Sequence, residues 1–162
     1  MHLRLIVVGT VATFLGAVGD AHAQTATQLV RFQVNAINQL AVSGSPALMV
    51  INSATAGSAP TPVTAGGTSY AVTTNESNQK ISASIDQALP SGVMLEVTLG
   101  APSGASSLGA VALSTASADV VTGISGVSAA SLPITYRLSA TTSVQMSAPE
   151  ARTVTFTIVS GS

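Results

Sequence analysis

Apolar and polar residues alternate with a period of two over several stretches of this chain. In Thr153–Val159, the residues Val154, Phe156 and Ile158 fall on one side and threonines on the other. A period of two over this length predicts a half-buried β-strand, with Phe156 deeply buried at its centre. The same pattern predicts further strands at Leu29–Val42, Ala47–Asn52, Ser69–Thr74, Lys80–Gln87, Val93–Leu99, Ala110–Ser114 and Ile134–Thr141.

The segments between these predicted strands have turn and loop compositions. They are rich in Gly, Ser, Pro and Asn, as in SGSP, TAGSAPTPVTAGG, NESN, LPSG and GAPSGASSLG. Asp119–Val127 fits either a short helical turn or a strand. Strands at this spacing are typical of an all-β domain. Two antiparallel sheets packed face to face bury such a pattern most naturally, so we predict an antiparallel β-sandwich.

The first 23 residues have the features of a secretory signal peptide. A short basic start precedes an apolar stretch from Leu3 to about Val18, and Ala21-His22-Ala23 has the small-x-small pattern that signal peptidase cleaves. The apolar stretch is shorter than the ~20 residues that a membrane-spanning helix needs. We predict cleavage after Ala23 and a single β-sandwich domain over residues 24–162. The predicted location is secreted, extracellular or at the cell surface, with the periplasm as a transit compartment.

The residues after Ala23 carry almost no net charge and include neither histidine nor cysteine. Without disulfides, stability has to come from the core and the hydrogen-bonded sheets. A net charge near zero weakens the repulsion between copies and favours self-association. No basic patch exists for a phosphate backbone, so nucleic acid is not an expected partner. The charged residues are Arg31, Lys80, Arg137 and Arg152, and Glu76, Asp86, Glu96, Asp119 and Glu150.

Aromatic residues are also scarce. Phe32, Tyr70, Tyr136 and Phe156 are the aromatic residues after Ala23. They are too few for the two aromatic girdles of outer-membrane proteins, so we do not expect the mature chain to be embedded in a membrane. Both tyrosines are in phase with apolar neighbours, which favours packing in the core over a role in sugar binding.

No catalytic site is predicted. A serine nucleophile with a histidine base, a thiol nucleophile, and a zinc or haem site all need His or Cys. Ser77-Asn78-Gln79-Lys80 matches the S-x-x-K of serine acyl-enzymes, but that motif works at the start of a helix. Here it lies in an expected hairpin connection. The carboxylates are scattered along the chain, so solvent exposure explains them better than paired-acid hydrolysis does.

Three other patterns receive a structural interpretation. A calcium ion held by loop acids stays open, although no D-x-D spacing indicates one, and no other cofactor is predicted. Asn75-Glu76-Ser77 matches the N-glycosylation pattern, and a turn asparagine explains it better. Gly66-Gly67 is interpreted as a loop pair and not as a phosphate-binding loop, because no lysine or helix follows it.

The C-terminal sequence LPITYRLSATTSVQMSAPEARTVTFTIVSGS resembles the closing hairpin of bacterial secreted fimbrial and spore-coat-U-like pilin subunits. In those subunits a tyrosine-containing strand meets a final T-V-T-[FVI]-T-I strand. VRFQVNAINQLAVSG is similar to the first strand of those domains and of WxL-like surface modules. The resemblance implies an immunoglobulin-like β-sandwich used as a surface building block, with no catalytic residue. The chain departs from these families because it lacks the fimbrial cysteine pair and any tryptophan.

Two classes of function follow from these observations. The first is a non-catalytic structural subunit of a bacterial surface filament, coat or matrix, which associates with itself or with sibling subunits. Gln24–Val34 would then complete the sheet edge beside Thr153–Val159 of a neighbour by β-strand addition. The second is a monomeric secreted binding module or adhesin for a surface glycan or protein. The candidate assembly residues are Val30, Phe32, Val34, Val154, Phe156 and Ile158.

Overall fold

The structure, a computed structural model, describes residues 24–145 and 148–161. The predicted signal peptide, residues 1–23, lies outside the described residues. The chain divides into two units, Met1–Gln33 and Val34–Ser162. In the first unit, residues 24–33 are exposed and have no regular secondary structure. The described residues of the second unit form strands and connecting loops.

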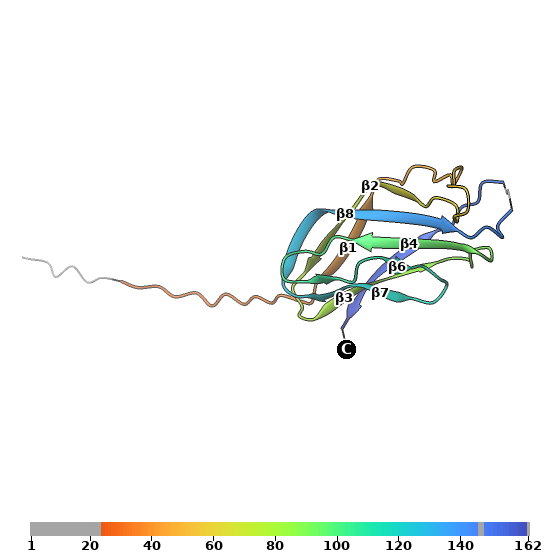
Figure 1. Cartoon of the computed structure of the whole chain (residues 1–162). Helices are drawn as coiled ribbons and strands as arrows, with labels where there is room; N and C mark the ends of the chain where they lie inside the picture. Colours follow the sequence, from red (N-terminus) through yellow and green to blue (C-terminus); the bar gives the residue numbers. More distant parts are fainter. Residues whose placement is uncertain (1–23, 146–147, 162) are drawn as a thin grey trace, which may run out of the picture. The chain divides into compact units, whose positions relative to one another are not determined.

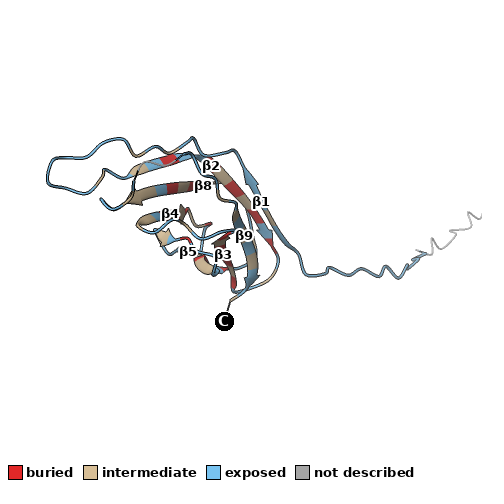
Figure 2. Cartoon of the chain, turned by 90° about the vertical axis from the view of Figure 1, so that its right-hand side faces the viewer, coloured by how far each residue is buried: buried red, intermediate tan, exposed pale blue. Residues whose placement is uncertain are grey.

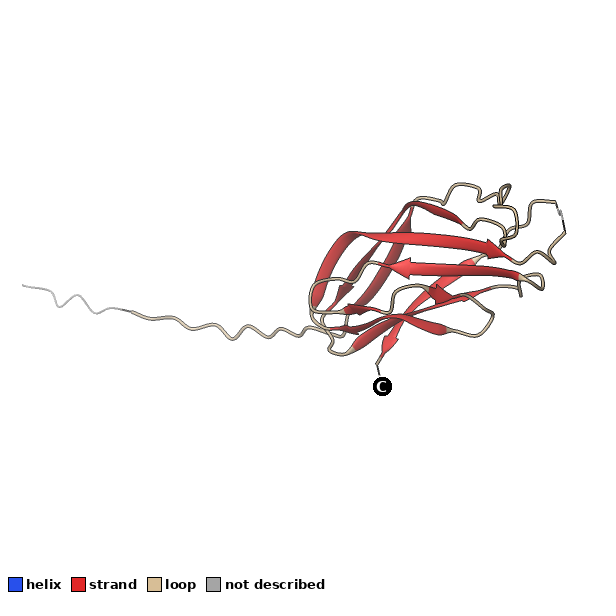
Figure 3. Ribbon diagram, in the orientation of Figure 1, coloured by secondary structure: helices blue, strands red, loops and turns tan. Residues whose placement is uncertain are grey.

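The second unit contains two antiparallel sheets, and its described residues form no helix (Figures 1 and 3). One sheet has five strands in the order β1-β2-β8-β4-β6, and the other has four in the order β5-β7-β3-β9. This arrangement is consistent with the predicted β-sandwich. The strands are β1 (Asn38–Ser43), β2 (Val63–Thr74), β3 (Gln79–Ile85), β4 (Val93–Leu99), β5 (Ser106–Ser107), β6 (Val111–Ala112), β7 (Ala118–Ile124), β8 (Val127–Ala140) and β9 (Val154–Ser160).

One apolar core takes side chains from both sheets. Tyr70 on β2 and Ile134 on β8 come from the five-stranded sheet, and Ile81 on β3 and Val121 on β7 come from the four-stranded sheet. All four are almost completely buried. Figure 2 shows buried positions interrupted by exposed or half-buried ones along the strands. This alternation turns one face of each sheet inward.

Most of the predicted strands are present. Val93–Leu99 is β4, and the predictions at Lys80–Gln87, Ala110–Ser114 and Thr153–Val159 overlap β3, β6 and β9. Asp119–Val127, where two interpretations were open, contains most of strand β7. β2 and β8 both extend beyond the predicted strands towards their N-termini, because they pair with each other along most of their lengths.

Two strand predictions are wrong in whole or in part. Of Leu29–Val42, only the segment from Asn38 onward is a strand, and residues 24–37 have no regular secondary structure. Ala47–Asn52 forms no strand, and its Leu48 side chain is exposed. Alternation provides a strand with one apolar face, but a strand persists only where a neighbouring strand satisfies its backbone hydrogen bonds.

The connections also differ from the prediction. The NESN turn does not close a hairpin, because β2 and β3 belong to different sheets, and the same holds for β8 and β9. Gly66-Gly67 is not a loop pair: it lies within β2 at a break in register with β8. Gly67 has a φ of 83° there, a left-handed conformation that glycine adopts without steric cost.

Candidate functional site at an open sheet edge

Strand β9 forms one edge of the four-stranded sheet. Within residues 24–145 and 148–161, it pairs on one side with β3 and has no strand on the other side. Its inward side chains Val154, Phe156 and Ile158 lie opposite Ile85, Ala83 and Ile81 of β3. The β3 residues are buried, whereas the β9 residues are only half-buried. The apolar face of β9 is therefore incompletely covered.

Strand β1 forms an edge of the other sheet and contacts β9. Val42 on β1 lies directly opposite Tyr70 on β2, so both side chains are on the core face of the sheet. Tyr70 is buried, yet Val42 is 49% exposed. The core is therefore incompletely covered on this flank. We call this flank the open edge and define it by strands β1 and β9.

The candidate assembly residues are divided between the two units. Val154, Phe156 and Ile158 lie together on β9 at the open edge. Val30 and Phe32 belong to the first unit, and Val34 begins the second. These three side chains are strongly exposed, reaching 91% for Phe32. The structure therefore contains an uncovered apolar strand face and a separate exposed apolar segment with the same alternation.

The prediction that Phe156 is deeply buried is wrong. The residue is half-buried, because β9 is an edge strand that, among the described residues, pairs only with β3. The alternation of the sequence correctly identified the inward face of β9. It contained no information on whether a further strand lies beside it.

We expect Phe156→Ala to lower the free energy of unfolding of the monomer by about 2 kcal/mol, roughly half the usual loss for a core phenylalanine. Urea denaturation followed by circular dichroism would measure it. Thr157→Ala is the matched control, because Thr157 is exposed on the outer face of the same strand. A loss for Phe156→Ala as large as that of a fully buried phenylalanine would contradict the open edge.

Asn75 fixes the point at which the chain enters the second unit. Its Oδ1 accepts a hydrogen bond from the backbone N–H of Ile37 at 2.7 Å, and its Nδ2 donates to the carbonyl of Asn35 at 2.8 Å. The Asn75 backbone N–H also donates to the Ile37 carbonyl, at 3.2 Å. The asparagine of the N-glycosylation pattern thus has a structural role, although the left-handed backbone that the turn interpretation invoked lies at Asn78, with a φ of 52°, and not at Asn75.

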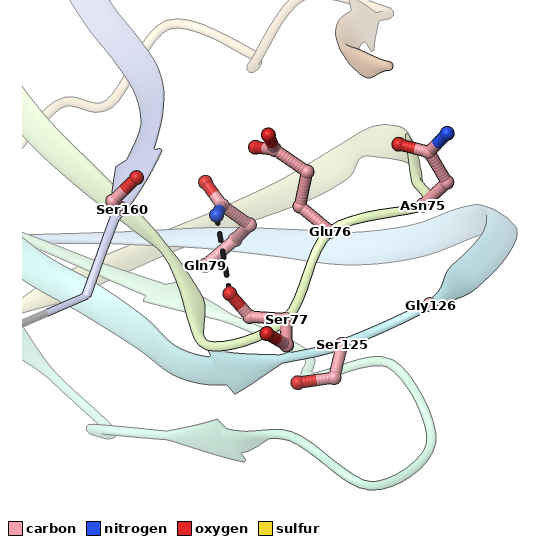
Figure 4. Close-up of a pocket in the computed structure, with 7 residues that line it drawn as sticks. All are labelled: Asn75, Glu76, Ser77, Gln79, Ser125, Gly126 and Ser160. Atoms are coloured by element: carbon pink, nitrogen blue, oxygen red, sulfur yellow. Dashed lines mark hydrogen bonds between the residues drawn. The ribbon is translucent and has the colours of Figure 1, made fainter. Parts of the chain in front are cut away.

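A polar pocket of about 700 Å³ lies at the end of the open edge where β9 finishes. Figure 4 shows Gln79 between Ser160 and Glu76, among the residues that line it. Gln79 is only 3% exposed, and no residue that the structure describes donates a hydrogen bond to its Oε1. Its Nε2 donates to the Ser77 carbonyl at 3.2 Å, which fixes the orientation of the amide because a carbonyl oxygen cannot donate. An unsatisfied buried acceptor costs about 1–3 kcal/mol.

Among the other candidate chemical groups, Ser77 lies in a loop, and Lys80 and Glu96 are held in ion pairs. Ser77 of the S-x-x-K match lies in the β2–β3 connection, and Lys80 pairs with Asp119 at 3.0 Å. Glu96 pairs with Arg137 across strands β4 and β8. Across the part of the chain that the structure describes, no three His, Cys, Asp or Glu side chains gather where they could hold a metal ion.

Both tyrosines pack in the core, as predicted. The Tyr70 hydroxyl donates a hydrogen bond to the carbonyl of Gly100 at 2.6 Å. Burial raises the pKa of Tyr70 to about 12 and also raises the pKa of Tyr136, because the phenolate is disfavoured away from water. Neither phenol is placed to act as an acid or base near neutral pH.

Over residues 24–145 and 148–161, no helix has the length and apolar character needed to cross a membrane.

Comparisons with known proteins identify no relative. No family model matches the chain, and no curated protein or solved structure matches it.

Proposed function

We propose that this chain is a non-catalytic structural subunit of a bacterial surface filament, coat or matrix, exported by its signal peptide and built as an immunoglobulin-like β-sandwich. Copies associate by β-strand addition at the open edge. The alternating segment Gln24–Val34, here called the tail, of one copy adds to strand β9 of another.

The observation that carries this proposal is the match between two incomplete apolar surfaces. On β9, which has one unpaired edge, the inward side chains of Val154, Phe156 and Ile158 are only half-buried. Val30, Phe32 and Val34 are strongly exposed and alternate with the same period. Adding one to the other buries both surfaces and satisfies the free backbone groups of β9.

Strand β9 also lacks the features that protect sheet edges from pairing. Natural edge strands carry charged side chains or proline, or are very short. Val154–Ser160 has neither charge nor proline and extends over 7 residues. Together with a net charge of −1 for the whole chain, this composition favours association over repulsion.

The test compares the chain from Gln24 with a variant lacking residues 24–34, by light scattering and electron microscopy. We expect filaments or ladders of subunits from the first and none from the second. Phe32→Asp should abolish assembly because it places a charge on the inward face. Gln33→Asp, its matched control, places the same charge on the outer face and should leave assembly intact.

A stable monomer from the chain beginning at Gln24, at high concentration and with tail amides protected from hydrogen exchange, would contradict the proposal. That result would favour a monomeric binding module or adhesin, in which the tail pairs within its own chain.

A further inference from the structure

The buried Oε1 of Gln79 has no donor within residues 24–145 and 148–161, and Gln79 lies beside the open edge. Gln79 pairs with Ser160, the last residue of β9. Both residues line the polar pocket (Figure 4). Because opposite residues in an antiparallel pair share a face, Gln79, Ser160 and the next residue across β9 would form one inward-facing row. The donor that Gln79 Oε1 lacks can therefore come from an added strand.

The tail has the same division into polar and apolar parts as the open edge. Its first residues, QTATQ, are polar, and LVRFQV after them is largely apolar. On β9 the order is reversed, because the apolar residues from Val154 to Ile158 precede Ser160 and the polar pocket. Matching polar to polar and apolar to apolar requires the tail to run antiparallel to β9.

In one antiparallel register, every inward apolar residue of the tail lies opposite an inward apolar residue of β9. It also places Leu29 opposite Val159 on the outer face, where both side chains are exposed in the isolated chain. A shift by two residues in either direction places a polar side chain opposite one of the inward apolar residues. The inward pairs of the register are Val30 with Ile158, Phe32 with Phe156, and Val34 with Val154.

This register places Gln28 opposite Ser160. Strands lie about 4.8 Å apart, so the backbones of Gln28 and Gln79 would be roughly 10 Å apart across β9. Two glutamine side chains span that distance over the small side chain of Ser160. We propose that the pocket at Gln79 is the docking site for Gln28 of a second copy, whose Nε2 donates to Gln79 Oε1. This inference rests on the proposed strand addition.

The tail that adds to β9 has to come from a second copy, because its own chain is held at Asn35, beside the pocket. Antiparallel addition puts Val34 opposite Val154, at the far end of β9 from the pocket. In its own chain Val34 precedes Asn35, which Asn75 binds beside the pocket. β9 is roughly 20 Å long, and one residue spans about 3.5 Å. Addition therefore links one copy to another, and a head-to-tail series of such links extends into a filament when it does not close into a ring.

Cysteine cross-linking of the full chain from Gln24 tests the register, because the chain has no cysteine of its own. Arg31→Cys combined with Thr157→Cys places two thiols opposite each other on the outer face. We expect oxidation to give a ladder of disulfide-linked multimers. Arg31→Cys combined with Thr155→Cys is the matched control, which would cross-link if the tail ran parallel to β9. A ladder from the control pair, or a disulfide within one chain, would overturn the inference.

The contribution of Gln79 is measured in the Arg31→Cys and Thr157→Cys background. Gln28→Ala should slow ladder formation about tenfold, and Gln79→Met should do the same. The two changes combined should be no slower than either alone, because both remove one hydrogen bond. Additive effects would overturn the Gln28–Gln79 contact. If the chain from Gln24 assembles but the control pair is the one that cross-links, only the register is refuted. If the chain from Gln24 never assembles, the proposed function itself is refuted.

Discussion

Replacement of Ile81 by alanine is expected to lower the free energy of unfolding by about 4 kcal/mol, within the range for large-to-small changes in a packed core. Ile81 is completely buried. It lies on β3, which has β7 on one side and β9 on the other, so neighbouring strands limit how far the surroundings can close around the lost atoms. Urea denaturation followed by circular dichroism measures the change, since the chain has no tryptophan.

Val159→Ala is the control for Ile81→Ala. Val159 belongs to the neighbouring strand β9 but is 38% exposed on its outer face. We expect this change to alter the free energy of unfolding by no more than about 0.5 kcal/mol. Equal losses from the two variants would show that β3 does not form the centre of the core.

The second large effect is a loss of stability in alkaline solution that depends on Tyr70. Its pKa is raised from 10.0 to about 12 by burial, so the unfolded chain ionises this phenol at a lower pH than the folded chain. The stabilisation that comes from the neutral Tyr70 phenol is complete below its pKa in the unfolded chain. It is lost as the pH rises through its pKa in the folded chain. With ~1.4 kcal/mol per pKa unit, the expected loss is about 2–3 kcal/mol between pH 10 and 12.

Tyr70→Phe separates this ionisation from the other effects of high pH. At neutral pH the free energy of unfolding of the variant should be about 1 kcal/mol lower, because it lacks the hydrogen bond to the Gly100 carbonyl. Above pH 10 its stability should fall less steeply than that of the parent. The remaining slope includes Tyr136, whose pKa burial also raises. Parallel curves for the two proteins would mean that the Tyr70 phenol is accessible to water in the folded state.

The sequence by itself predicted the strands that have a regular apolar alternation. Val93–Leu99 is an example: its side chains at Leu95, Val97 and Leu99 are buried as the pattern indicates. Because side chains alternate between the two faces of any strand, period two is a local property that needs no knowledge of neighbours. For the same reason the inward face of β9 was assigned correctly. The core positions of both tyrosines followed from the same phase.

The sequence did not reveal where strands find partners. Leu29–Val34 alternates as regularly as β4, but residues 24–37 form no strand in the single chain. In contrast, Gly66-Gly67 lies within β2 despite its loop composition, since the pairing with β8 continues past the bulge. Pairing depends on residues distant in sequence, and it decides whether the backbone groups of an apolar segment are satisfied.

The two central features of the candidate site come from tertiary structure alone. That β9 is an edge strand follows from the order of four strands drawn from separate parts of the chain. That the buried Oε1 of Gln79 finds no donor among the described residues is likewise seen only in the folded chain, where Gln79 lies opposite Ser160 on that edge. The sequence determined which side chains are apolar and which way they face. Only the packing of distant strands decided which of them are covered, because coverage is a property of neighbours and not of the segment itself.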